Sequence, residues 1–330
     1  MKRHTTDRAS WSSPNPTSPV IENRVPFYAP ILRVSHNSRP RTGRHETRWG
    51  WVELSGPVLT MKHWAILKMS MARAVKKQVF QGTGGMAVWF DTYRVKKELG
   101  AEYSGGKGHR LFLQRMEDMR RVKLTVRNKR TGRIIVSGIL DWFSYTYDED
   151  DQDQFAGGIK TARSRQGNCL HEIRISPNYM QFFREDLRVH YDPLVPEIVS
   201  IPDGTIQAVI LFFLTHKEKC QYPVRQVMEI IGAIEEAMTK GTVSKIMAKP
   251  EKFKTELENL GIFLEGKMLR YERHPKVFFT NPPAPLTFPA STGVVINAER
   301  GPEPTPIGTA LEATPEAMVS PRSPENASFL

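Results

Sequence analysis

The fold is decided by the stretch Asp91-Thr-Tyr-Arg-Val-Lys-Lys-Glu-Leu-Gly100, read together with the residues that follow it to Asp148. Asp91 is an N-cap residue type, and Gly100 is a residue type that ends helices. The segment from Thr92 to Leu99 is therefore predicted to be helical. A Gly-rich turn over residues 101–108 follows, and it separates this helix from the next periodic segment.

The second segment is predicted to be a helix from about Arg110 to Arg121. Phe112, Met116 and Met119 recur at i, i+4 and i+7, which places them on one apolar face. Next, residues 122–127 alternate as a half-buried strand does, residues 128–132 form a polar turn, and residues 133–140 return as a partner strand. A helix, a turn, a second helix and a β-hairpin in this order predict a winged helix.

The charge of this unit points to its partner. Residues 107–133 contain ten Lys or Arg and two acidic residues. Cations on an exposed helix face and on a hairpin tip bind DNA by neutralising phosphates, and side chains near the start of the helix read base edges. The predicted DNA-binding residues of this unit are Lys107, His109, Arg110, Gln114, Arg115, Arg127, Lys129, Arg130 and Arg133. The alternative is an ordinary α+β domain with a solvated basic face.

Composition supports a polyanionic partner for the whole chain. Its 330 residues leave room for about two domains, and 47 Lys or Arg against 35 acidic residues give a net charge of +12. That balance favours nucleic acid over a membrane surface. The sequence shows no apolar run long enough to span a membrane, and it shows no signal-peptide pattern at its N-terminus. A cytoplasmic protein is therefore expected. Cys169 and Cys220 show no zinc spacing and are expected to be reduced thiols.

The second half repeats the order of the first. A strand is predicted over residues 171–176, a short helix over 177–183 and another strand over 195–201. Asp203 caps an apolar helix, a second helix follows Pro223, and a third helical region spans Thr242 to Leu260. A hairpin turning at Gly266-Lys267 completes a second winged helix. The predicted DNA-binding residues here are Lys245, Lys249, Lys252, Lys254, Lys267 and Arg270.

The predicted architecture is therefore α+β, with two tandem winged-helix domains between disordered tails. Residues 1–24 are expected to be a disordered arm, 25–147 the first domain, 148–168 a charged linker, 169–280 the second domain and 281–330 a disordered tail rich in Pro, Ser, Thr, Ala and Glu.

Three stretches resemble theta-plasmid replication initiators of the TrfA and IncQ RepC kind. Residues 26–33, Pro-Phe-Tyr-Ala-Pro-Ile-Leu-Arg, resemble the entry segment of TrfA-type initiators. Glu53-Leu-Ser-Gly-Pro57, with the helix that carries Trp64, resembles the first strand and helix of the IncQ initiator. Residues 93–102, the Ser-Gly-Gly turn and residues 116–122 resemble its helix-turn-helix.

The resemblance covers about residues 25–274 and implies a function. Initiators of this family bind directly repeated origin sites (iterons) in double-stranded DNA, open the origin and recruit the host replicative helicase. A host initiator protein and self-association are further implied partners, and no cofactor is expected. The same modules would also suit a winged-helix transcriptional repressor, which is the alternative prediction.

Enzymatic functions are weakly supported by the residues. The pattern around Gly106-Lys107-Gly108 approaches a phosphate-binding loop, but it follows a helix and has no hydroxyl side chain after the lysine for Mg²⁺. A nicking enzyme would need paired metal-binding histidines, and no His-x-His pair occurs among the nine histidines. The acidic run at 148–153 lacks the spacing of a calcium loop. No catalytic residue and no metal ligand is therefore predicted.

Overall fold

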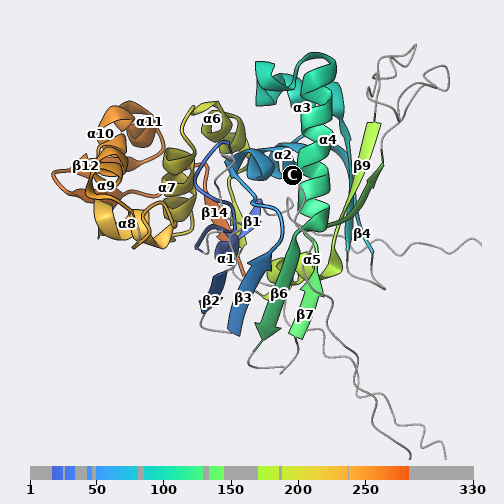
Figure 1. Ribbon diagram of the computed structural model, residues 1–330, viewed down its shortest axis with the longest axis horizontal. Coiled ribbons are helices and arrows are strands. Elements are labelled where there is room, and N and C mark those ends of the chain that lie inside the picture. Colours follow the sequence, from blue (N-terminus) through green and yellow to red (C-terminus); the bar gives the residue numbers. More distant parts are fainter. Residues whose placement is uncertain are drawn as a thin grey trace, which may run out of the picture. The chain divides into compact units, whose positions relative to one another are not determined.

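Figure 1 shows the computed structural model of the chain, which describes residues 17–24, 27–33, 43–46, 50–80, 85–128, 134–144, 170–185, 188–236 and 238–281. All of them lie in one compact unit, Met1–Ala284. The whole of the expected linker, the expected tail after residue 281 and most of the expected arm fall outside the described residues. Within the described part, no helix has the length and apolarity to cross a membrane.

Three helices form the first helical layer, and local sequence signals start two of them. They are α2 (Met61–Ala72), α3 (Thr92–Leu99) and α4 (Gly105–Arg121), with the 3₁₀ turn η1 (Ala101–Tyr103) between the last two. Thr60 caps α2. The Asp91 carboxylate accepts the N–H groups of Tyr93 and Arg94 at the start of α3, as predicted. Helix α4 begins five residues earlier than Arg110, because the Gly-rich segment itself is helical. In Figure 1, α4 stands beside α2, and α2 also contacts α3.

A four-stranded antiparallel sheet completes the first winged helix. It contains β4 (Ala74–Val79), β5 (Met86–Asp91), β8 (Leu140–Ser144) and β9 (Leu170–Ile175), in the order β4-β5-β9-β8. Strand β5 precedes the helix-turn-helix, and β8 and β9 follow it as a hairpin, which is the strand order of a winged helix. Residues 145–169 connect β8 to β9 and lie outside the described residues.

The strand pairing corrects two predictions. Strand β9 was predicted to open the second domain, yet all its partners are strands of the first. The hairpin predicted to be the wing pairs elsewhere. It consists of β6 (Lys123–Asn128) and β7 (Ile134–Ser137), which join β2 (Gly43–Glu46) and β3 (Gly50–Ser55) in a separate antiparallel sheet of order β2-β3-β6-β7. Local alternation identifies a strand but not its partner, and this caused both errors.

The N-terminal residues differ from the expected arm. Residues 17–24 contain β1 (Ser18–Pro19) and α1 (Val20–Arg24). Strand β1 pairs with β10 (Arg188–His190), and β10 pairs with β14 (Phe278–Thr280). Helix α5 (Pro177–Glu185) lies beside β1. Three segments that are far apart in the sequence therefore form one small sheet.

The second winged helix has the predicted order, with short elements. It consists of α7 (Gly204–Leu214), β11 (Cys220–Pro223), α8 (Val224–Ile230), α9 (Lys240–Met247), α10 (Lys249–Lys252), α11 (Lys254–Asn259), β12 (Ile262–Glu265) and β13 (Met268–Tyr271). The sheet order is β11-β13-β12, with all pairs antiparallel. Asp203 caps α7 through the N–H groups of Thr205 and Ile206. Every residue of α7 is buried, as its apolar sequence predicts.

The segment predicted as a strand at residues 195–201 is helix α6 (Val195–Ser200), preceded by the 3₁₀ turn η3 (Asp192–Leu194). Val195 and Ile198 are its buried residues, at the i, i+3 spacing of a helix. Pro196 stands in the first turn, where its missing N–H costs nothing. A short apolar segment does not by itself distinguish a strand from a helix. Here the helical conformation buries Val195 and Ile198, and α6 contacts α2, α3 and α7.

Candidate nucleic-acid interface

Helix α4 has a buried face and an exposed face that carries positive charge. Its buried apolar side chains are Phe112, Leu113, Met116 and Met119, which confirms the predicted apolar stripe. Its exposed residues beyond the glycines are Lys107, Arg110, Gln114, Arg120 and Arg121. Glu117 forms ion pairs with Arg120 and Arg121 at 2.6 Å, so the cations near the end of the helix are partly neutralised. The other exposed cations of α4, Lys107 and Arg110, lie in its first two turns.

The N-terminus of α4 is open to an anion. Ser104 is the N-cap residue, but its side chain makes no capping hydrogen bond. A Cβ built on Gly105 or Gly106 would meet no atom within 4 Å. Uncapped N–H groups and the helix dipole both favour a negative group at this end, and Lys107 adds a full positive charge. This end of the helix can therefore approach a phosphate closely.

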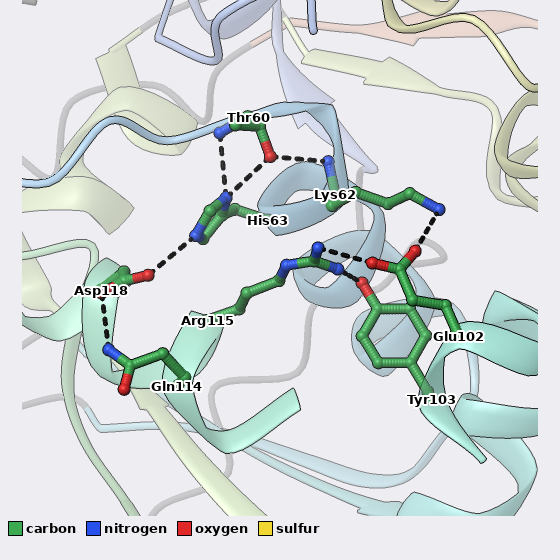
Figure 2. Close-up of polar contacts among 8 residues, drawn as sticks. All are labelled: Thr60, Lys62, His63, Glu102, Tyr103, Gln114, Arg115 and Asp118. Carbon is green, nitrogen blue, oxygen red and sulfur yellow. Dashed lines mark hydrogen bonds and ion pairs between the residues drawn. The ribbon is translucent and has the colours of Figure 1, made fainter. Parts of the chain in front are cut away.

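Arg115 is buried, whereas the prediction placed it on the exposed, base-reading face of the helix. Its side chain is buried, donates to the Tyr103 hydroxyl and to Glu102 Oε1 at 2.8 Å, and stacks over the Tyr103 ring (Figure 2). Arg115 directly precedes Met116 and follows Phe112 by three positions, so it flanks the apolar stripe. Its cationic side chain suggested exposure, but η1 supplies a carboxylate and a phenol for it.

A second set of contacts joins the C-terminal half of α4, at Gln114 and Asp118, to the start of α2 (Figure 2). Thr60 donates its backbone N–H to His63 Nδ1 at 2.9 Å, so Nε2 carries the ring proton and faces Asp118 Oδ2 at 3.3 Å. Burial lowers the pKa of His63, against the opposing effect of Asp118. Asp118 also accepts the Gln114 amide at 3.0 Å. These contacts fix the orientation of α4, and they occupy one side of Gln114, a predicted base reader that remains exposed.

His109 is buried, which corrects its prediction as a DNA-binding residue. Only 2% of its surface is exposed, and its ring packs edge-on against His171 of β9 at 6.0 Å between centroids. Burial, and then the charge of Lys96, lower the pKa of His109 to about 4. The ring is therefore a neutral part of the interface between α4 and the sheet. On the helical wheel, it lies beside Phe112 rather than opposite it.

Helix α3 also exposes polar and cationic side chains that were not among the predicted DNA-binding residues. Tyr93 is 72% exposed, and Arg94 and Lys97 are also exposed. Thr92, Val95 and Leu99 bury the opposite face of α3. That i, i+3, i+7 pattern was the available signal, because it assigns Tyr93, Arg94 and Lys97 to the outer face.

Of the four DNA-binding cations predicted on the β6–β7 hairpin, Arg127 is the one among the described residues. Arg127 is exposed on β6, opposite Ile134 of β7. Lys129, Arg130 and Arg133 lie outside the described residues. Since this hairpin belongs to a different sheet from β8 and β9, its predicted role as the wing of the α4 unit does not hold.

The predicted second reading helix is divided into three. Helix α9 has no buried residue, whereas α10 and α11 bury Pro250 and Leu257. Acidic residues Glu251, Glu256 and Glu258 all lie in the last two helices. Helix α9 contains two lysines, Lys240 and Lys245, and no acid. In the order α8, turn, α9, it is the second helix of a helix-turn-helix, which makes α9 the candidate reader.

Two predicted DNA-binding cations of the second unit are engaged within the protein. Lys249 contacts Asp203 Oδ2 at 2.8 Å and Thr205 Oγ1 at 2.8 Å, so it ties α10 to the cap of α7. Arg270 contacts Glu265 and Glu272, each at 2.7 Å, and stacks over Phe263. The remaining predicted cations of this unit, Lys245, Lys252, Lys254 and Lys267, are exposed.

No group of three or more His, Cys, Asp or Glu side chains that could hold a metal occurs among the described residues. Burial raises the pKa of the Cys220 thiol to about 11, which disfavours the nucleophilic thiolate. Cys169 lies outside the described residues.

No family model matches the chain, and no curated protein matches it. Two solved structures resemble it, both of domains 2 and 3 of RctB. One is 9% identical, with a TM-score of 0.48, and covers 80% of this chain and 99% of its own. The other is 10% identical, with a TM-score of 0.43, and covers 76% of this chain and 94% of its own.

Proposed function

We propose that this protein binds double-stranded DNA through two winged helices and acts as a plasmid replication initiator. The observation that carries the DNA-binding part is the exposed cationic face at the start of α4, in a helix-turn-helix whose other face is buried. The proposed action is binding and deformation of DNA rather than catalysis.

The first winged helix offers both kinds of contact that DNA recognition needs. Arg110 and Gln114 lie on the exposed face of α4, where side chains of a helix in the major groove meet base edges. Lys107 and the uncapped helix N-terminus suit a phosphate. Arg94 and Lys97 on α3 add cations where the first helix of such a unit crosses the DNA backbone.

The second winged helix offers α9. Thr242 and Lys245 are exposed on it, and neither is needed by the core. Thr239 caps the helix through the Thr242 N–H at 3.3 Å. Two reading helices in one chain suit a long site or a repeated one.

The origin-specific part of the proposal rests on the resemblance of residues 25–274 to theta-plasmid initiators. It comprises binding to iterons, opening of the origin, and recruitment of the host replicative helicase, with a host initiator as a further partner. A cytoplasmic location follows from the same role.

The decisive experiment uses the full chain and the DNA that flanks its gene. Short duplexes from that region are titrated against a random duplex of equal length by fluorescence anisotropy. We expect tight binding to a subset of fragments that share a repeat, and replication of a plasmid carrying them only when the protein is supplied. Binding without replication would favour the repressor, and nicking of supercoiled DNA with Mg²⁺ or Mn²⁺ would favour an enzyme.

Single substitutions on α4 should distinguish residues that contact base edges from residues that neutralise DNA phosphates. Arg110→Ala is expected to weaken binding to the cognate repeat by about 1–3 kcal/mol and to relax specificity. Lys107→Ala is expected to weaken cognate and random DNA alike and to lower the slope of log affinity against log salt by roughly one. The measurement is anisotropy at several salt concentrations.

Lys276→Ala is the matched control, because Lys276 is an exposed cation outside both helix-turn-helix units. It should change neither specificity nor the slope. An equal loss of cognate and random binding in Arg110→Ala would transfer the reading role to α9.

A further inference from the structure

One side-chain amide on the exposed face of α4 is held in a single orientation. Gln114 Nε2 donates to Asp118 Oδ1 at 3.0 Å, and the Gln114 side chain is exposed. A carboxylate can only accept hydrogen bonds, so the group of Gln114 that faces Asp118 is its NH₂ and not its carbonyl oxygen. One N–H of the amide is therefore engaged within the protein. Its second N–H and its carbonyl oxygen are left for a ligand.

Asp118 is kept ionised and in place by α2. Its other oxygen, Oδ2, lies 3.3 Å from His63 Nε2, which carries the ring proton because Nδ1 accepts the Thr60 N–H at 2.9 Å (Figure 2). Burial raises the pKa of Asp118, but the hydrogen bonds from His63 and Gln114 outweigh burial and lower that pKa below its usual value. At neutral pH both oxygens of Asp118 are therefore acceptors.

A further set of contacts fixes the rotation of α4 about its own axis. Arg115, the next residue after Gln114, donates to Glu102 Oε1 at 2.8 Å. The other oxygen of Glu102 pairs with Lys62 Nζ at 2.9 Å (Figure 2). Lys62 and His63 are neighbours in the first turn of α2, so this turn holds α4 through Arg115 as well as through Asp118. A polar group that is positioned before its ligand arrives loses little freedom on binding.

We infer that Gln114 reads an adenine, and that Asp118 is the positioning residue that makes this reading selective. The inference rests on the proposed function, since it needs α4 in the major groove. There adenine presents the N6 amino donor beside the N7 acceptor. The Gln114 carbonyl oxygen accepts from N6, and its remaining N–H donates to N7. Adenine therefore satisfies both groups that Asp118 leaves available.

The other three bases match these two groups less well. Guanine presents two acceptors, O6 and N7, and two N–H groups would be needed to satisfy both. Asp118 already engages one N–H of Gln114. Cytosine presents the N4 amino donor and thymine the O4 acceptor, so each of them gains one hydrogen bond. The position should therefore prefer adenine by about tenfold to a hundredfold, as a good bidentate contact does.

The test begins with the full chain and a pool of random-sequence duplexes, from which the preferred site is selected and sequenced. At each position of that site, the four duplexes that differ at one base pair are compared by fluorescence anisotropy. We expect one position at which the wild type prefers adenine and Gln114→Ala binds all four duplexes alike. Gln114 is exposed, so this variant should fold as the wild type does. A loss of folded protein would lower all four affinities together and leave their ratios unchanged.

Asp118→Asn should reverse the orientation of the Gln114 amide. The N–H of His63 still needs an acceptor, so the new carboxamide turns its oxygen toward His63 and its NH₂ toward Gln114. Gln114 then accepts with its carbonyl oxygen and presents both N–H groups outward. The preference at this position should shift from adenine toward guanine, which offers two acceptors.

Glu117→Gln is the matched control for charge. It also removes one negative charge from α4, at the neighbouring position, but Glu117 contacts Arg120 and Arg121 rather than Gln114. Any gain in affinity from the lost charge is common to both variants and to all four duplexes. Glu117→Gln should therefore keep the adenine preference.

The outcomes separate this inference from the proposed function. Selective binding in which no adenine preference depends on Gln114 would overturn the inference and leave the proposed function standing. An adenine preference that Asp118→Asn keeps as fully as Glu117→Gln would overturn the positioning role of Asp118. Equal binding of the wild type to every duplex would overturn the proposed function and this inference with it.

Discussion

Glu22→Ala is expected to destabilise the folded protein by about 3–5 kcal/mol, because it leaves a buried lysine without its counter-charge. Lys68 is completely buried on α2, and its ammonium contacts Glu22 Oε2 at 2.6 Å and the carbonyl of Thr17 at 3.0 Å. Ser18 and Tyr179 donate their hydroxyls to the same carboxylate. Burial lowers the pKa of Lys68 while Glu22 opposes that shift, so the lysine depends on this partner.

The measurement is chemical denaturation at neutral pH. Glu229→Ala is the matched control, because Glu229 forms an exposed i, i+4 pair with Arg225 at 2.9 Å. It should cost about 0.5 kcal/mol or less. The double variant Glu22→Leu with Lys68→Met should recover much of the loss, since replacing both charges by apolar groups removes the unpaired ion. A loss of unfolding free energy below about 1 kcal/mol in Glu22→Ala would contradict this prediction. It would show that Lys68 gains another partner, or becomes a neutral amine, at little cost in stability.

The same contacts set the N-terminal limit of the folded unit. A chain that starts at Val25 lacks Glu22, Thr17 and β1, whereas a chain that starts at Thr17 keeps them. We expect the first to unfold at much lower denaturant concentration than the second. Equal denaturation midpoints for the two chains would show that residues 17–24 add no stability. That result would agree with the original expectation of a disordered arm.

Mild acid should destabilise the protein through His109 and His171. Burial is the main cause that lowers their pKa values, from 6.5 to about 4 for His109 and to about 3 for His171, and Lys96 adds to both shifts. Below pH 6.5 these two histidines therefore bind protons in the unfolded chain but stay neutral in the folded chain. This contribution to stability is complete above pH 6.5 and is lost as pH falls toward the folded-state values. Each histidine should account for about 2 kcal/mol between pH 6.5 and about pH 5, at about 1.4 kcal/mol per unit.

The test is the free energy of unfolding across that pH range in the wild type and in His171→Phe. An aromatic ring is kept because His171 packs near Phe90 and His109. In the variant, the slope of unfolding free energy against pH should fall by the equivalent of roughly one bound proton. This change is independent of the variant's stability at pH 7. His63, His190, His216 and His274 also have lowered pKa values, so some slope remains in the variant. A slope identical to the wild type would show that His171 is already protonated in the folded state.

The sequence by itself determined those elements whose signals are local. Asp91 and Asp203 mark helix starts because their side-chain oxygens accept hydrogen bonds from N–H groups two or three residues away. The apolar stripe of α4 follows from helical periodicity, and the β12–β13 hairpin follows from its Gly266-Lys267 turn. The exposed place of Arg110 follows from the same periodicity, whereas Lys107 was assigned to the preceding turn and lies in the first turn of α4.

Only the tertiary structure decided which strands pair and which cations are buried. Strand β9 joins β5 across some eighty residues of chain, and β1 joins β10 across more, and nothing in a strand's own alternation names its partner. Arg115, His109 and Lys249 have the composition of a solvated surface, yet each is held by groups that approach from other elements: Glu102 and Tyr103, His171, and Asp203. Burial of a polar side chain depends on a partner brought by the fold, and that partner is not visible in local sequence.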